Sequence, residues 1–260
     1  MEDYLTIKTQ IKGEVITLWL SRPEVHNALN DLMIREISSF FTEIEENNKV
    51  RIVIIRGMGK SFCSGADLAW MKSSFTLNEA ENLKESHQLS NMFNLIFKSN
   101  KVIIGAIHGN VFGGGLGLVA ACDLAYCVTN AKFSLSETRI GMAAASITPY
   151  LLQKINPSNL KELIFTAKIF DGNEAVKYQL INQSFIDQEV MDIYLNSIID
   201  QIIRNGKQAI VISKKLINQL TEIAVTEKIK QIPQLLAQIR VSPEAQEGFS
   251  AFLEKRKPKW

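Results

Sequence analysis

Two loops rich in small residues and one glutamate are the places where this sequence offers residue types that could do chemistry. Gly113 to Gly115 follow apolar residues and precede an apolar, helix-like segment, so they place unpaired backbone N–H groups at a helix start. Glycine also lets another molecule approach the backbone closely, because it has no Cβ. We therefore predict an anion or oxyanion site centred on Gly114.

The second loop, residues 57–68, is equally rich in small residues. If the N–H groups around Ala66 and Gly114 converge on one carbonyl oxygen, they form a device that stabilises an enolate. Glu137 follows a short strand-like segment and is flanked by small residues, so it could act as acid and base on the carbon next to that carbonyl.

Each of these features also has a purely structural explanation. The turn formed by Gly113 to Gly115, called the glycine corner below, is equally compatible with a tight strand-to-helix turn that binds nothing. An isolated carboxylate such as Glu137 is more often solvated or helix-capping. A dinucleotide fingerprint is poorly supported, because Leu118 stands where G-x-G-x-x-G needs glycine. Cys63 is expected to be a buried thiol, and His108 a structural imidazole bonded to backbone.

The segments that must position these residues alternate between strand and helix patterns. Residues 4–11 and 14–20 predict a hairpin around Lys12-Gly13. Asn30 or Asp31 can cap a helix that runs to about Glu46. Further strands are expected at 51–56, 102–107, 124–128, 132–135 and 184–186, with a long helix at 79–98 and helical signals dominating from 147 onward. This order predicts an α/β core followed by a helical last quarter.

Composition sets limits on function. The chain has 260 residues, of which 46% are hydrophobic and 22% charged, and its formal charge is only +2. This small net charge gives no argument that the protein binds nucleic acid or an anionic membrane. No apolar run approaches the ~20 residues that span a bilayer. The three cysteines lack CxxC spacing and the N-terminus lacks a signal-peptide pattern, so we expect reduced thiols and a cytoplasmic protein. No cluster has metal-ligand spacing.

Several motifs, in this order and spacing, resemble the enoyl-CoA hydratase/isomerase (crotonase) family over essentially the whole chain. They are Ser21-Arg22-Pro23 with Asn27-Ala28-Leu29, residues 62–68 ending in Ser-Gly-Ala-Asp-Leu, residues 112–123, residues 133–141 and residues 247–257. Within the family, Ala69-Trp70-Met71, residues 117–123 and residues 136–139 most resemble bacterial methylglutaconyl-CoA hydratase-like members, which act in leucine breakdown.

The resemblance implies a crotonase-like spiral of ββα units, with the α/β core and active site in residues 1–195 and a helical trimerisation region in 196–260. It also implies an acyl-CoA substrate, with coenzyme A present as part of the substrate rather than as a bound cofactor. Metal, nucleic acid and membrane are not expected as partners. A homotrimer or a dimer of trimers is expected.

The same resemblance assigns roles to individual residues. The N–H groups of Ala66 and Gly114 would bind the thioester oxygen, and Glu137 would transfer protons. Contacts with CoA or the acyl group would come from Arg22, Val25, Ser64, Ala66, Asp67, Leu68, Ala69, Gly114, Gly117, Ala145, Phe249 and Lys255.

One position departs from the family pattern. Typical hydratases carry a second glutamate three residues after the middle glycine, where this chain has Gly117, and a proline where Ala144-Ala145 stand. We expect hydration of a 2-enoyl-CoA, with water held by backbone groups near Ala145 or by a carboxylate on the substrate. The alternatives are a double-bond isomerase that uses Glu137 alone, and a CoA-binding member without catalysis.

Overall fold

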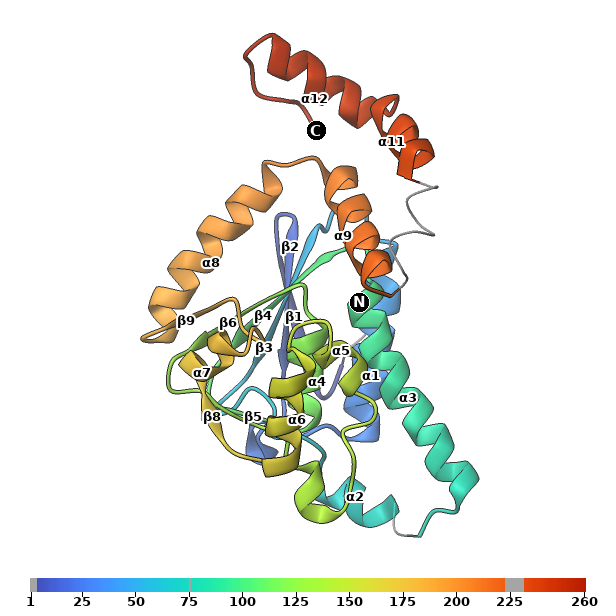
Figure 1. The fold of residues 1–260 in the computed structure, drawn as a ribbon, viewed down its shortest axis with the longest axis vertical. Coiled ribbons are helices and arrows are strands. Elements are labelled where there is room, and N and C mark those ends of the chain that lie inside the picture. Colours follow the sequence, from blue (N-terminus) through green and yellow to red (C-terminus); the bar gives the residue numbers. More distant parts are fainter. Residues whose placement is uncertain (1–3, 75, 223–231) are drawn as a thin grey trace. The chain divides into compact units, whose positions relative to one another are not determined.

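The computed structural model describes residues 4–74, 76–222 and 232–260 (Figure 1). The chain divides into two compact units, Met1–Leu195 and Asn196–Trp260. Both sheets lie in the first unit, whereas the described residues of the second are helical or irregular. The mixed α/β fold expected from the sequence is confirmed, and in the described residues no helix is long and apolar enough to cross a membrane.

The main sheet has six strands in the order β1-β2-β3-β4-β6-β9. Its antiparallel edge pair confirms the predicted hairpin, with β1 at Ile7–Lys12 and β2 at Val15–Leu20. The other neighbours pair in parallel, through β3 (Ile52–Gly57), β4 (Val102–Ile107), β6 (Leu124–Val128) and β9 (Gln183–Phe185). Their aliphatic residues are almost all buried, as expected for parallel strands covered on both faces.

A second, three-stranded sheet has the order β5-β7-β8, with β5 at Asn110–Phe112, β7 at Lys132–Ser134 and β8 at Phe170–Asp171. Strand β5 is one that the sequence pattern does not predict. The chain leaves β4 at Ile107, turns at Gly109 with φ 62°, and reaches the glycine corner only after β5. A Cβ at Gly109 would lie 2.0 Å from the carbonyl oxygen of Lys60, so this turn requires glycine.

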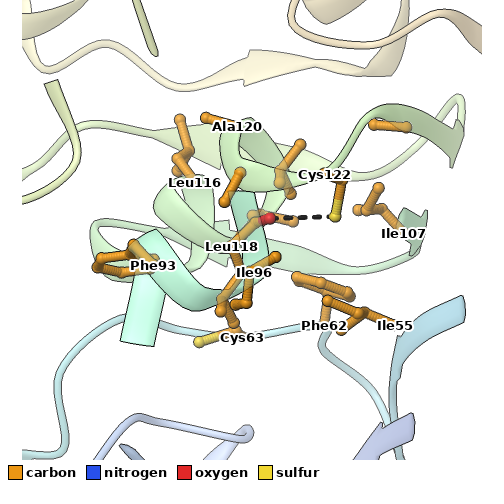
Figure 2. Close-up of a cluster of buried hydrophobic side chains, with 14 of the residues drawn as sticks. Ile55, Phe62, Cys63, Phe93, Ile96, Ile107, Leu116, Leu118, Ala120 and Cys122 are labelled. Atoms are coloured by element: carbon orange, nitrogen blue, oxygen red, sulfur yellow. Dashed lines mark hydrogen bonds between the residues drawn. The ribbon is translucent and has the colours of Figure 1, made fainter. Parts of the chain in front are cut away.

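Two long helices begin at side-chain caps. Asn30 accepts a hydrogen bond from the N–H of Met33 at the start of α1 (Asp31–Glu45). Asn78 and Glu81 form a capping box at the start of α3 (Glu79–Lys98). The two helices contact each other (Figure 1). Their inner faces contribute to the core, in which Phe93 of α3 and Leu116 of α4 (Gly114–Ala121) belong to one buried cluster (Figure 2).

The remaining elements of the first unit are short. They are η1 (Pro23–Val25), α2 (Leu68–Ser74), η2 (Glu137–Ile140), α5 (Thr148–Leu151), α6 (Pro157–Thr166) and α7 (Gly172–Lys177). Helix α8 (Gln188–Ile203) runs across the boundary between the units.

The second unit contains α9 (Lys207–Glu222), α11 (Ile232–Arg240) and α12 (Pro243–Leu253). Glu244 of α12 accepts hydrogen bonds from the N–H groups of Gln208 and Ala209, which belong to the first turn of α9. The indole N–H of Trp260 donates to the carbonyl of Arg204. These contacts hold the C-terminal segment against the start of α9.

Candidate active site

The two glycine-rich loops meet through their backbones. The N–H of Cys63 donates to the carbonyl of Asn110 (3.2 Å), and the N–H of Phe112 donates to the carbonyl of Cys63 (3.0 Å). A Cβ at Gly65 would lie 3.0 Å from the carbonyl oxygen of Phe112, and one at Gly115 only 2.5 Å from that of Cys63. Because glycine has no side chain, the loops approach this closely, and the structure brings the backbones around Ala66 and Gly114 together.

Ala66 sits between two residues that hydrogen-bond to Leu29. The N–H of Leu29 donates to Gly65 (2.7 Å), and the N–H of Asp67 donates back to Leu29 (2.8 Å). In such a parallel bridge the middle residue turns its own N–H away from the partner strand. Within the described residues, the N–H of Ala66 donates to no protein acceptor. It is therefore a free donor on the side of the loop away from Leu29.

Gly114 is the first residue of α4, so its N–H has no partner within the helix. The preceding N–H, that of Gly113, donates to Ser134 of β7 (3.1 Å), which fixes the corner against the second sheet. In the part of the chain that the structure describes, the N–H of Gly114 also donates to no protein acceptor. The helix dipole adds to its attraction for a developing negative charge.

Glu137 faces the glycine corner from η2. A Cβ added at Gly113 would lie 3.3 Å from its Oε1 and 3.9 Å from the Cα of Gly65, so the carboxylate borders the glycine corner at the point where that corner faces the other loop. The short helix that carries it is anchored by Arg139, which donates to the carbonyl of Ala167 (2.7 Å), and by Thr138, which donates to that of Ile164 (2.9 Å).

The carboxylate of Glu137 lacks the partners that usually stabilise a buried charge. Its Oε2 is buried and has no hydrogen-bond partner among the described residues. Burial raises the pKa of Glu137 above its ordinary value, although a backbone hydrogen bond from its own N–H opposes the shift. A carboxylate in this state is a stronger base than one in water, which suits proton transfer to and from carbon.

Arg22 and Asp67 form an ion pair that holds the Ala66 loop. One guanidinium nitrogen of Arg22 contacts Asp67 at 2.8 Å, and another donates to the carbonyl of Ala28 at 2.7 Å. The second oxygen of Asp67 accepts from the N–H groups of Ala69 and Trp70 at the start of α2. Burial alone would raise the pKa of Asp67, but these hydrogen bonds together lower it. The contact with CoA implied for Arg22 stays a prediction, and its guanidinium already has two protein partners.

A pocket of about 890 Å³ adjoins this pair. Most of the CoA-contact residues that the resemblance implies line this pocket, namely Arg22, Val25, Ser64, Ala66, Asp67, Leu68 and Ala69. Their contact with CoA stays a prediction. It adds residues that the sequence reasoning missed: His26, Ala28, Asn30, Asp31, Leu32, Trp70 and Ser73. The sequence held a signal for Trp70, because it stands in the motif Ala69-Trp70-Met71 that carries part of the family resemblance. Gly114 and Glu137 are not among the lining residues of this pocket. Gly65, which Gly113 faces, is flanked by two residues that are, Ser64 and Ala66.

Gly117 lies in the packed interior rather than along this pocket. It is buried in α4, and a Cβ there would lie 2.3 Å from Cγ2 of Ile147 and 2.7 Å from Cζ of Phe93. Figure 2 shows Phe93 in the buried cluster beside α4. The place that a second carboxylate would need is therefore filled by two apolar side chains. Substrate contact by Gly117 stays a prediction, and no sequence signal pointed to Ile147 or Phe93.

The other predicted contact residues lie elsewhere. Ala145 is exposed, and its N–H donates to the carbonyl of Ala143 (2.8 Å), which leaves that donor unavailable to hold water in this arrangement. Phe249 is half-exposed in α12, and Lys255 follows that helix with φ 54°. Both belong to the second unit, and their contact with CoA stays a prediction.

Two other sequence expectations are confirmed. Cys63 is fully buried, and burial raises the pKa of its thiol to about 12. The Nε2 of His108 is 2.9 Å from the carbonyl oxygen of Gly59, so this imidazole is bonded to backbone. Neither residue is placed to act as a nucleophile or base.

Residues 10–260 match the family described as enoyl-CoA hydratase/isomerase. The chain belongs to this family. It is 30% identical to the peroxisomal Delta(3,5)-Delta(2,4)-dienoyl-CoA isomerase of Arabidopsis thaliana, over 100% of this chain and 98% of that protein. It is 29% identical to the crotonyl-CoA hydratase of Syntrophomonas wolfei, over 98% and 97%.

Solved structures of the family share the fold. The crystal structure of an enoyl-CoA hydratase from Shewanella pealeana superposes with a TM-score of 0.94 and 30% identity, covering 99% of this chain and 96% of that one. Family membership makes this chain an enzyme of enoyl-CoA chemistry. The relatives include both hydratases and isomerases, so the reaction has to be argued from this chain's own site.

Proposed function

We propose that the enzyme moves the double bond of an enoyl-CoA by proton transfer, with Glu137 as the only catalytic carboxylate. The observation that carries this proposal is the packing at Gly117, where Ile147 and Phe93 occupy the space that a second glutamate would need. A single carboxylate is sufficient for isomerisation, because the same group removes one proton and returns it at another carbon. No water is consumed in the reaction.

The steps follow from the arrangement of donors and base. The N–H groups of Ala66 and Gly114 bind the thioester oxygen. Glu137 then removes a proton from Cα of a 3-enoyl-CoA, and the electron pair moves to the thioester oxygen as a dienolate. The protonated Glu137 returns the proton to Cγ, the carbonyl re-forms, and the double bond lies between Cα and Cβ. Loss of one such N–H donor typically raises the barrier by about 2.7–4 kcal/mol.

Hydration of a 2-enoyl-CoA is the second candidate, supported by the similarity to the crotonyl-CoA hydratase of Syntrophomonas wolfei. Glu137 would then need another group to hold the attacking water. The N–H of Ala145 is engaged with Ala143, so a carboxylate on the substrate, as in methylglutaconyl-CoA, is the group that would best take this role.

The test is a panel of straight, branched and carboxylated 2-enoyl- and 3-enoyl-CoAs, followed by NMR for water addition and for double-bond migration. We expect migration at least tenfold faster than hydration for the preferred substrate. Hydration that equals or exceeds migration would refute the isomerase proposal in favour of the second candidate. Binding of acyl-CoA with no turnover across the panel would refute both and leave a non-catalytic CoA-binding protein.

A homotrimer or dimer of trimers also remains part of the proposal. Apolar side chains of η2 and α6 support it, since Ile140 is 60% exposed and Phe165 is 75% exposed in the single chain. Light scattering at micromolar protein should give three or six chains, and a monomer would contradict the expectation.

A further inference from the structure

Residues 134–139, called the Glu137 arc below, are fastened at both ends to one carbonyl group. Ser134, three residues before Glu137, donates its hydroxyl to the carbonyl of Ala167 (3.0 Å). Arg139, two residues after Glu137, donates a guanidinium N–H to the same oxygen (2.7 Å). A carbonyl oxygen has two lone pairs, so it accepts both bonds at once. The two ends of the Glu137 arc therefore meet at the residue that ends α6.

Ala167 is a strained and buried anchor for these two bonds. It is 1% exposed and ends α6 with φ 47°, a left-handed conformation that costs energy for alanine. Strain of this kind persists only where the surrounding structure fixes it, and such residues cluster at functional sites. The C-terminal end of a helix also carries partial negative charge, which attracts the cation of Arg139. Ala167 thus gives both ends of the Glu137 arc one fixed position.

The Glu137 arc is also tied to the glycine corner. The carbonyl of Ser134 accepts the N–H of Gly113 (3.1 Å), the residue before Gly114. Ser134 is 3% exposed, so it is shielded from water. One buried residue therefore joins the corner that offers the Gly114 N–H to the segment that carries the base. Proton transfer requires such precision, because displacing a reacting group by about 1 Å can cost roughly 10²-fold in rate.

We propose that Ser134 and Arg139 are positioning residues for Glu137, which hold its carboxylate at the glycine corner by closing the Glu137 arc on the carbonyl of Ala167. This inference rests on the proposed function, because it takes Glu137 as the group that moves the proton. Ser134 and Arg139 act through Glu137 and not on the substrate. Since both bonds are needed to close the arc, loss of either releases it, and loss of both should cost little more than loss of one.

The experiment measures kcat and KM of Ser134→Ala, Arg139→Met and the double variant, for whichever reaction the wild type catalyses. We expect each single variant to lose about tenfold or more in kcat, while KM and the affinity for free CoA stay within about threefold of the wild type. The double variant should lose no more than about threefold beyond the slower single variant. Arg139→Lys keeps a charged donor and should recover most of the lost kcat. Arg56→Met is the matched control and should keep the wild-type kcat, because it removes a guanidinium that bonds to Asp192 of α8 rather than to the arc.

Three outcomes would overturn the proposal. The first is a kcat within about threefold of the wild type in both single variants. The second is a pair of losses that multiply in the double variant, since each residue would then act on its own. The third is Arg139→Lys as slow as Arg139→Met, which would show that the bond to Ala167 is not what matters.

Amide hydrogen exchange separates this proposal from the proposed function. The N–H of Met142 donates to the carbonyl of Glu137 (3.0 Å), so its exchange reports how firmly the Glu137 arc is held. We expect this N–H to exchange about tenfold faster in Ser134→Ala and Arg139→Met than in the wild type and Arg56→Met. If the wild type turns over no enoyl-CoA, the proposed function fails, and this exchange alone decides the role of the arc. Equal exchange in all four proteins would then overturn it.

Discussion

Gly117→Ala should destabilise the protein, although replacing glycine by alanine inside a helix normally stabilises it. The helix propensity of alanine favours the change by about 1 kcal/mol. The added Cβ would lie 2.3 Å from Ile147 and 2.7 Å from Phe93, closer than non-bonded atoms approach. Overpacking of this kind costs roughly 1–3 kcal/mol, so we expect a net loss of about 1 kcal/mol.

The assay is urea unfolding followed by circular dichroism. Gly248→Ala in α12 is the control, because its Cβ would meet nothing closer than 3.7 Å, and we expect it to raise the free energy of unfolding by up to ~1 kcal/mol. In an Ile147→Ala background the cost of Gly117→Ala should shrink, since the closest contact is gone. If Gly117→Ala stabilises the protein as Gly248→Ala does, space for a second side chain exists and the argument for a single carboxylate fails.

Three further expectations follow from the site. Arg22→Met should lower the free energy of unfolding in urea by about 3 kcal/mol, because it leaves the buried Asp67 carboxylate without its ion-pair partner. If the effects of Arg22→Met and Asp67→Asn are additive in a double-mutant cycle, the ion pair does not contribute to stability. Ala66→Pro should lower kcat by about 10²–10³-fold with little effect on unfolding, and unchanged kinetics would exclude the Ala66 amide. Glu137 has a raised pKa, so the stability it contributes at low pH is lost as pH rises through that pKa. The advantage of Glu137→Gln over the wild type in free energy of unfolding should therefore grow as the pH rises above about 4.5, the ordinary pKa of this carboxyl group, and a difference independent of pH would contradict the shift.

The sequence predicts well what depends on neighbouring residues. The hairpin, the cap of α1 at Asn30 and the bounds of α3 follow from local periodicity and from residue types with a defined capping role. Strand β5 was missed because it has only three residues and forms by pairing with β7, which lies further along the chain.

The candidate site likewise combines features that neighbouring residues indicate with features that depend on the tertiary fold. Small residues at 65–66 and 113–114 indicate exposed backbone N–H groups, and the structure brings the two loops together. The ion pair of Arg22 with Asp67 joins residues 45 positions apart. The side chains that fill the space at Gly117 come from two other parts of the chain, Phe93 from α3 and Ile147 from the residue before α5. Such contacts depend on the tertiary fold, so no spacing rule in the sequence could indicate them.

Exchange of substrate protons in D₂O tests the role of Glu137 most directly. The wild type should carry a proton from Cα to Cγ of a 3-enoyl-CoA while it moves the double bond, and deuterium should enter whenever the protonated Glu137 exchanges with D₂O before it returns the proton. Glu137→Gln should slow both migration and exchange by about 10²–10⁴-fold while acyl-CoA affinity stays within a few-fold. Exchange and migration in Glu137→Gln at rates within tenfold of the wild type would show that another group carries the proton.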